Sequence, residues 1–263
     1  MEVRIGALAR LTWRLARRDI EARYRGAALG ILWPFVHAIA LLAVYTYVFG
    51  VVFRARWPRT AADSLTSFAL TLFCGLIAFN VLSECLARAP TLLLTVPHYV
   101  KRVVFPLEVL PVSLVGSALF HGLVNVIVLL AASLLLNGSV PWTALLLPLV
   151  AVPLVLLALA VGWLLGSLGA FLRDLTQAVG LASQILLFGT PIFYSEEVLP
   201  KTLRRLVVVN PLAWLVQNLR RILLWGEPPD WVGLAVWTLT LGALSVVAFA
   251  WFVKTKPAFA DVL

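Results

Sequence analysis

Six stretches of the chain contain no Asp, Glu, Lys or Arg and have the length of membrane-crossing helices. A helix needs about 20 apolar residues to cross a hydrocarbon layer ~30 Å thick. Continuous apolar runs lack the alternating pattern of membrane β-strands. The sequence therefore predicts an all-α, polytopic membrane protein, with one transmembrane domain over residues 1–263. Its six predicted transmembrane helices cover residues 31–53, 65–83, 109–136, 140–172, 175–195 and 231–253.

Residues 4–21 show a different, amphipathic pattern. Leucines and isoleucines recur on one side of a helical projection, and arginines gather on the other, which predicts a cationic helix lying on the membrane surface. Such a helix can serve as a positive anchor alone, or it can also dock a partner subunit. The exposed basic positions are Arg10, Arg14, Arg17 and Arg18.

Composition supports a membrane location and argues against nucleic-acid binding. The chain is 62% hydrophobic with a formal net charge of +9, but its basic residues are distributed around the apolar runs. More of them lie inside if the N-terminus is cytoplasmic, as the positive-inside rule favours. We therefore expect a multi-pass protein with both termini in the cytoplasm. The N-terminal region lacks a signal-peptide cleavage pattern, so residue 31 should begin an uncleaved first span.

The turn before the first span combines charge with glycine. Arg23 and Arg25 lie beside Gly26 and Gly30. Cationic side chains and free backbone N–H groups at a helix start can hold a phosphate. This turn is a candidate anion site at the membrane surface.

Two interruptions between spans are longer than a simple connection requires. Residues 88–106 are divided by prolines and carry the basic pair Lys101 and Arg102, which predicts a short contact helix for a cytoplasmic partner. Residues 206–219 are uncharged but too short to span, so residues 198–226 are expected to form short re-entrant helices on the outer side. An amphipathic surface helix is the alternative for this second segment.

Motifs for chemistry are absent from the sequence. No phosphate-binding loop of the form G-x-x-x-x-G-K-[ST] occurs, so ATP should not bind to this chain. His37, His98 and His121 lack metal-ligand spacing, and Cys74 and Cys85 are too few for a metal site. We expect no metal and no cofactor on this chain. Glu84 and Glu108 remain candidate acids if the protein is an intramembrane transferase.

The chain is rich in aromatic residues. Flat rings provide tolerant platforms for the apolar faces of sugars, so some rings are candidates for lining a path, with lipid-facing packing as the alternative. The candidate path residues are Phe35, Tyr45, Tyr47, Phe49, Phe188, Phe193, Tyr194 and Trp214.

Four segments together resemble the membrane subunits of ABC exporters for lipid-linked polysaccharides, which include O-antigen, capsule and teichoic acid exporters. They are RRDIEARYRGAALGILWPFVHAIALLAVYTYVFG (17–50), HYVKRVVFPLEVLPVS (98–113), FLRDLTQAVGLASQILLFGTPIFYS (171–195) and NPLAWLVQNLRRILLWG (210–226). The resemblance follows the chain in order over most of residues 10–226.

The resemblance implies a homodimer bound to two separate ATPase subunits, which would carry ATP and Mg²⁺. It assigns residues 198–226 to outer gate helices, and places an entrance for the pyrophosphate of an undecaprenyl carrier at Arg23, Arg25, Leu29 and Gly30. It assigns the N-terminal helix and the 88–106 coupling segment to ATPase contact, and in that segment the contact residues would be Pro97, His98, Tyr99, Lys101 and Arg102.

The expected function is the translocating permease of an ATP-driven exporter that moves an O-antigen-like, lipid-linked polysaccharide across the bacterial inner membrane. The alternatives are the same architecture carrying capsule, teichoic acid, lipid or drug, and an intramembrane glycosyl or acyl transferase.

Overall fold

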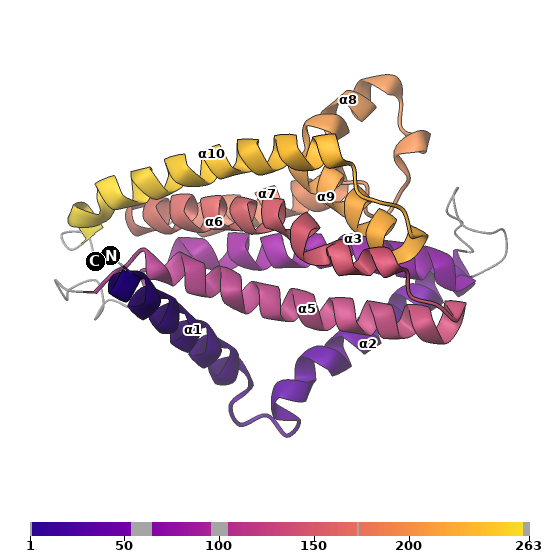
Figure 1. Cartoon of the computed structure of the whole chain (residues 1–263), viewed down its shortest axis with the longest axis horizontal. Coiled ribbons are helices and arrows are strands. Elements are labelled where there is room, and N and C mark those ends of the chain that lie inside the picture. Colours follow the sequence, from indigo (N-terminus) through magenta and orange to yellow (C-terminus); the bar gives the residue numbers. More distant parts are fainter. Residues whose placement is uncertain (1, 54–64, 96–104, 173, 260–263) are drawn as a thin grey trace.

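The structure, a computed structural model, describes residues 2–53, 65–95, 105–172 and 174–259. Every regular element in these ranges is helical, and five helical segments are long and apolar enough to cross a membrane (Figure 1). The predicted all-α, polytopic membrane fold is confirmed. The five segments are Gly30–Phe49, Ser67–Thr91, Val109–Asn137, Trp142–Phe171 and Trp231–Ala258.

The helices follow one another along the chain as a surface helix, a series of long apolar helices and a group of short helices before the last long one. Their bounds are α1 (Glu2–Tyr24), η1 (Gly30–Leu32), α2 (Trp33–Tyr45), η2 (Thr46–Val52), α3 (Leu65–Arg88), η3 (Ala89–Thr91), α5 (Val109–Asn137), η4 (Trp142–Leu146), α6 (Leu147–Phe171), α7 (Leu175–Gly189), η5 (Glu196–Val198), α8 (Lys201–Val209), α9 (Pro211–Arg220), η6 (Arg221–Trp225), α10 (Trp231–Thr255) and η7 (Lys256–Ala258).

The helix in the fifth apolar run is shorter than the sequence predicts. α7 has 15 residues, which corresponds to about 22 Å at the α-helical rise and falls short of a ~30 Å core. Thr190 is extended, because the following Pro191 disfavours a helical conformation at the residue before it. The expected span over 175–195 is therefore an apolar helix that ends six residues early, and only the five other runs form full-length spans.

α3 is the central helix of the bundle. In its apolar window 78% of residues are buried, against 11% for the segment that contains α2. It packs against α5, α6, α9 and η2. Its inner positions carry small side chains such as Cys74, Gly75 and Ala78, which let neighbouring helices approach closely.

Two glycines let neighbouring helices pack closely at the end of α3 nearest the chain termini. A Cβ on Gly169 would lie 1.9 Å from the Pro90 carbonyl oxygen, so α6 touches η3 where only glycine fits. A Cβ on Gly122 would lie 2.6 Å from Val81 Cγ2, so the Val81 side chain of α3 packs against the backbone of α5 at this glycine. These contacts hold the polar residues near the end of α3 in a fixed position relative to α5 and α6.

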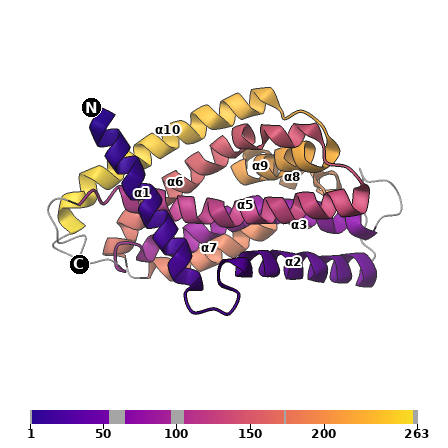
Figure 2. The ribbon, with the colours of Figure 1, turned by 60° about the horizontal axis from the view of Figure 1, so that its bottom comes forward.

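α1 lies outside this bundle and crosses α5 diagonally (Figure 2). Leu15 and Ala16 are buried, and Ala16 faces Gly116 of α5. α1 begins, and α10 ends, at the same end of the bundle (Figure 1). α2 then departs from the far end of α1 at a sharp elbow, formed by the turn at residues 25–29.

Candidate functional site

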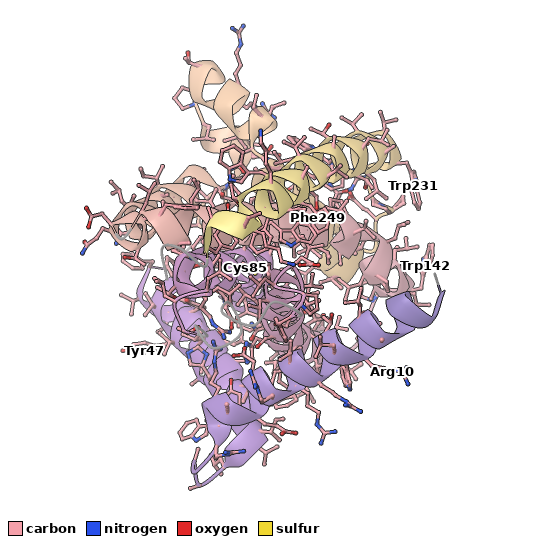
Figure 3. All side chains as sticks on the ribbon, turned by 90° about the vertical axis from the view of Figure 1, so that its left-hand side faces the viewer. Arg10, Tyr47, Cys85, Trp142, Trp231 and Phe249 are labelled. Carbon is pink, nitrogen blue, oxygen red and sulfur yellow. The ribbon has the colours of Figure 1, made fainter. Side chains whose placement is uncertain are left out.

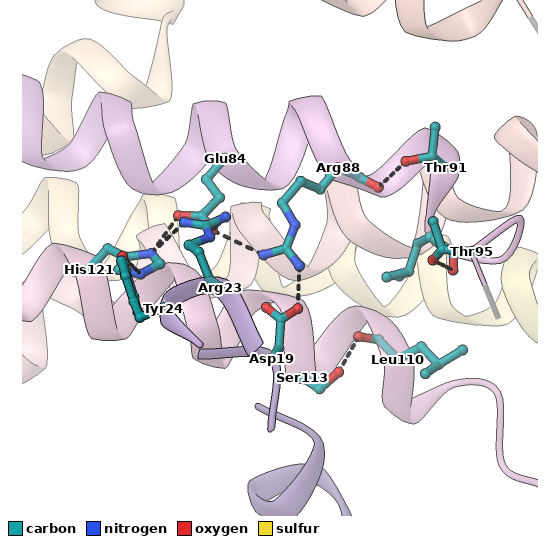
Figure 4. A network of polar contacts seen from close by, with 11 residues as sticks. Asp19, Arg23, Tyr24, Glu84, Arg88, Thr91, Thr95, Leu110, Ser113 and His121 are labelled. Carbon is teal, nitrogen blue, oxygen red and sulfur yellow. Dashed lines mark hydrogen bonds and ion pairs between the residues drawn. The ribbon is translucent and has the colours of Figure 1, made fainter. Parts of the chain in front are cut away.

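Glu84 of α3 is the centre of a cluster of ion pairs where α1 meets α3 and α5 (Figure 4). Its Oε1 accepts hydrogen bonds from Arg23 Nη2 at 2.7 Å and Arg88 Nη1 at 3.1 Å. Its Oε2 lies 2.9 Å from His121 Nδ1. The Glu84 side chain is only 14% exposed, so burial strengthens its dependence on these three partners.

The cluster extends onto α1 through two further contacts. Arg88 Nη2 donates to Asp19 Oδ1 at 2.5 Å, and Tyr24 Oη lies 3.0 Å from His121 Nε2. Burial alone would raise the pKa of Asp19, but hydrogen bonding and the charge of Arg88 outweigh it and lower that pKa. Two arginines thus face two carboxylates, so the charges of these four side chains balance.

A partly open cavity of about 600 Å³ lies beside this cluster, in the elbow between α1 and α2. Side chains of α1, α2, α3 and α5 line it. Among them are Arg23, Trp33, His37, Asn80, Glu84 and Asn125. The cavity has the size typical of ligand sites, about 300–1,000 Å³.

The structure separates the four residues expected at the entrance. Arg23 lines the cavity, but Glu84 neutralises its charge. Arg25 and Leu29 are exposed on the turn. Gly30 adopts φ +50°, and its N–H donates to the Ala27 carbonyl at 3.0 Å. Sequence reasoning identified the turn, but it did not connect the turn with Glu84 of α3 or His121 of α5, which the structure brings next to Arg23.

Half of the candidate path aromatics lie together. Phe49 is the centre of a group of rings, with centroid distances of 6.4 Å to Tyr45 and 6.2 Å to Phe193. Phe188 adjoins Phe193 at 6.0 Å. Phe53 and Phe68, which the sequence analysis did not select, also pack on Phe49. The spacing of rings at positions 45, 49 and 53, which places them on one helix face, was the available signal.

The other four candidate aromatics are outside this group of ring contacts. Phe35 packs against the main core, and Tyr47 is 62% exposed. Tyr194 donates a hydrogen bond to the Phe188 carbonyl at 2.8 Å. Trp214 donates to Asp230 Oδ2 at 3.2 Å, next to the start of α10.

The residues expected to contact an ATPase are only partly described. Arg10, Arg14, Arg17 and Arg18 are exposed on α1, opposite the buried Leu15 and Ala16. Pro97, His98, Tyr99, Lys101 and Arg102 lie outside the described residues. Within the described ranges, no group of three or more His, Cys, Asp or Glu residues could hold a metal ion.

Comparison with known proteins identifies the family. The family model for the ABC-2 type transporter matches residues 10–224, most of the chain. The chain belongs to the ABC-2 type transporter family. This ABC-2 permease is 26% identical to an O-antigen export system permease protein RfbA of Klebsiella pneumoniae, over 100% of this chain and 98% of that protein. It is also 26% identical to the RfbA protein of Myxococcus xanthus, over 89% and 86% of the two chains.

Family membership shows which subunit of the transporter uses ATP. An ABC-2 permease is a membrane subunit that is not itself catalytic, and in this family a partner ATPase uses the ATP. The two carboxylates considered as transferase acids are both engaged in ion pairs, Glu84 as described and Glu108 with Lys256 at 2.8 Å. The resemblance noted in the sequence is confirmed at the level of this family.

Proposed function

We propose that this ABC-2 permease is the translocating subunit of an exporter for an O-antigen-like polysaccharide carried on undecaprenyl pyrophosphate, in the bacterial inner membrane. The observation that carries the proposal is the full-length similarity to two RfbA permeases of Klebsiella pneumoniae, each covering 98% of the relative. The match covers the short helices before α10 as well as the spans, which supports a common function for the whole chain.

Two copies of the chain would enclose the path. The segment that contains α2 is the least buried of the five candidate spans, and α7 has only Val179 buried along its length. Both are apolar, and both flank the aromatic group around Phe49. A second copy that covers α2 and α7 would place these rings at the interface, where flat, sequence-tolerant surfaces suit a sliding sugar chain.

The contact with the ATPase subunits would be made by the arginine-rich side of α1 and by residues 88–106. α1 is joined to α3 by the Asp19–Arg88 and Arg23–Glu84 ion pairs. A movement of α1 therefore reaches the central helix through charged contacts. Both termini, at one end of the bundle, would lie in the cytoplasm, and α8 and α9 would form the outer gate.

The rival substrates are capsule, teichoic acid, another lipid or a drug. The rings gathered around Phe49 offer flat surfaces, which favours a carbohydrate over a drug. The RfbA relatives favour an O-antigen over the other polymers, because O-antigen export is what their names state.

Complementation tests the proposal. A bacterium that lacks its own O-antigen permease and ATPase would receive this chain with its ATPase subunit and the matching polymer genes. We expect the polymer at the cell surface, and lipid-linked polymer retained inside when the ATPase is inactivated. Equal surface polymer with and without this chain would contradict the proposal.

A further inference from the structure

The chain turns back onto the bundle after α10. α10 ends at Thr255, and the short turn η7 follows with Pro257 near its start, which cannot donate the hydrogen bond that would continue the helix. The next residue, Phe259, is fully buried. Residues beyond the helices of a domain are generally mobile unless packing holds them. The buried ring therefore indicates that residues 256–259, here called the η7 segment, have a fixed place in the structure.

Phe259 belongs to a small hydrophobic core distinct from the one around α3. Its ring centroid lies 5.4 Å from that of Phe252 of α10 and 5.8 Å from that of Phe171 at the end of α6. This core gathers segments that are far apart in the sequence at the end of the bundle where α10 ends (Figure 1). Its other buried members are Leu15, Leu93, Leu107, Val109, Leu110 and Ala170.

The two flanks of residues 96–104 lie in this core. Leu93 precedes these residues and Leu107 follows them, and both side chains are buried. Phe105, also on the second flank, is partly buried against the same core. Residues 88–106 are the segment proposed above to contact the ATPase subunit, so the core that holds Phe259 also holds both ends of that contact segment.

An ion pair joins the η7 segment to the second flank. Lys256 Nζ donates a hydrogen bond to Glu108 Oε2 at 2.8 Å, and both side chains are partly buried. Glu108 directly precedes α5 and Lys256 directly follows α10, so each charge also lies at the helix end that favours it. Trp163 of α6 donates from Nε1 to the Glu108 carbonyl at 3.2 Å. The start of α5 is therefore held by α6 and by the η7 segment.

From these contacts we infer that the η7 segment positions the ATPase contact of this permease. Phe259 packs in the core that holds both flanks of the contact segment, and Lys256 fixes the second flank through Glu108. Leu15 of α1 lies in the same core, so both surfaces assigned to the ATPase subunit share one packing centre. The inference rests on the proposed function for the place of that contact. It adds that residues outside the contact segment determine what fraction of the permease is competent to bind the ATPase subunit.

Charge variants test the link through Glu108. The permease in phosphatidylcholine nanodiscs would be immobilised and titrated with its purified ATPase subunit, without polymer. Lys256→Glu places two carboxylates together, so fewer molecules hold the contact segment in position, and the apparent affinity falls with that fraction. We expect a loss of about fivefold. Adding Glu108→Lys restores opposite charges, and the double variant should bind more tightly than Lys256→Glu alone.

Lys254→Glu is the matched control, because Lys254 is exposed two residues away and its substitution changes the net charge by the same amount. This variant should bind the ATPase subunit as the wild type does. An equal loss in Lys254→Glu and Lys256→Glu would show a general effect of charge, and a double variant no better than Lys256→Glu would show that the pair has no role. Either result would overturn the inference.

Variants of Phe259 separate positioning from general stability. Phe259→Ala should weaken ATPase binding about tenfold or more, whereas Phe259→Leu keeps most of the apolar volume and should retain most of the affinity. Arg220→Met provides a destabilised comparison, because Arg220 is buried against the Thr71 carbonyl near the start of α3, away from this core. It should lower the unfolding temperature and leave ATPase binding unchanged where the protein is folded. Equal weakening by Arg220→Met and Phe259→Ala, or full affinity in Phe259→Ala, would overturn the inference. The charge variants decide it if Phe259→Ala does not fold.

Polymer export is a separate readout. The binding experiment contains no polymer, so its outcome does not depend on which substrate the permease carries. Export by the wild type together with unchanged ATPase affinity in the variants would overturn the inference and leave the proposed function intact. Weaker ATPase binding in the variants, with no export of an O-antigen by the wild type, would support the role of the η7 segment and reject the proposed substrate.

Discussion

Arg220 of α9 donates a hydrogen bond from Nη2 to the Ile192 carbonyl at 2.9 Å, and so joins the outer helices to the segment where α7 ends. The same guanidinium donates to the carbonyls of Thr71 at 3.1 Å and Pro191 at 2.8 Å. Arg220 is 1% exposed. Its charge satisfies the carbonyl groups of Pro191 and Ile192, which the break at Pro191 leaves without helical partners, and with the bond to Thr71 this makes it the link between α3, α7 and α9. Figure 3, which draws the side chains on the ribbon, shows Cys85 of α3 in the middle of the bundle and Tyr47 and Trp231 at its edge.

Arg220→Met should destabilise the bundle by about 3 kcal/mol, because three buried carbonyls lose a charged donor and each such bond contributes ~1.5–3 kcal/mol at most. The midpoint of thermal unfolding in detergent measures the change. Arg221→Met is the matched control. Arg221 pairs with the half-exposed Glu227 at 3.2 Å, and a pair of this kind contributes ~0–1 kcal/mol. Equal shifts in the two variants would show that Arg220 has no special structural role.

Gly75→Ala tests the same contact from α3. A Cβ at position 75 would lie 2.9 Å from Arg220 Nη2 and 3.2 Å from Val216 Cγ1. The Arg220 guanidinium cannot yield without losing its carbonyls, so we expect a lower unfolding temperature and a cost of about 1–3 kcal/mol. Gly6→Ala in α1 meets nothing within 4 Å and should be neutral or slightly stabilising, since alanine favours helix. A neutral Gly75→Ala would mean that α9 is free to shift.

Local signals in the sequence predicted much of the helical structure but few of the long-range contacts that join the helices. Gly138 ends α5 with φ +74°, and Pro191 ends α7. Each residue ends its helix through the conformation that it imposes on the neighbouring backbone, so the sequence alone indicates the helix end. The structural role of Arg220 has no such local signal, because its acceptors are carbonyls 28 to 149 positions away. Carbonyl groups exist at every residue, so no sequence pattern indicates which of them a buried arginine will reach.

The candidate site was likewise predictable only where its residues are close together in the sequence. The glycine and arginine turn after Tyr24 indicated an anion site, since glycine and cationic residues lie close together in the sequence. The pairing of Glu84 with His121 joins α3 to α5 across 37 positions. It depends on the rotation of both helices about their axes, which is set by packing such as that of Gly122 against Val81. Apolar helices with weak amphipathicity carry little information about that rotation.

A double-mutant cycle should detect the link between α1 and α3. Arg23→Gln and Glu84→Gln each break a 2.7 Å ion pair. Glu84→Gln should be the more damaging, because Arg88 and His121 also lose their shared carboxylate. We expect a coupling free energy of about 1 kcal/mol between positions 23 and 84, measured by unfolding of the purified permease. The exposed pair Arg17 and Glu21 provides the control cycle, and coupling no larger than in that pair would contradict a structural link.

The contribution of Asp19 to stability should depend on pH. Its folded pKa is lowered below the ordinary value, so its ionised form stabilises the fold at every pH above the unfolded pKa of about 4. That contribution is lost as the pH falls through the folded pKa. The difference in unfolding temperature between the wild type and Asp19→Asn should be constant from about pH 5 to 8 and should narrow below about pH 4. Glu21→Gln, on the exposed side of α1, corrects for general acid effects. A difference that widens in acid would reverse the assigned direction.

Cysteine cross-linking should locate the contact between two copies. Ile39 on α2 and Ile185 on α7 are 57% and 65% exposed, although each lies on an apolar helix. Lipid can cover such faces, but a tunnel cannot be enclosed by helices that both face lipid, so we expect a second copy to cover them. Two variants, one with a single added cysteine on α2 and one with a single added cysteine on α7, would be co-expressed in membranes and treated with bifunctional maleimides. The native thiols Cys74 and Cys85 are buried in the fold and should not react. At least one α2–α7 pair should form a covalent dimer, whereas pairs that join α7 to the exposed Val246 of α10 should not. Dimers formed through α10 alone would move the interface to the opposite side of the bundle and leave the aromatic group around Phe49 facing lipid.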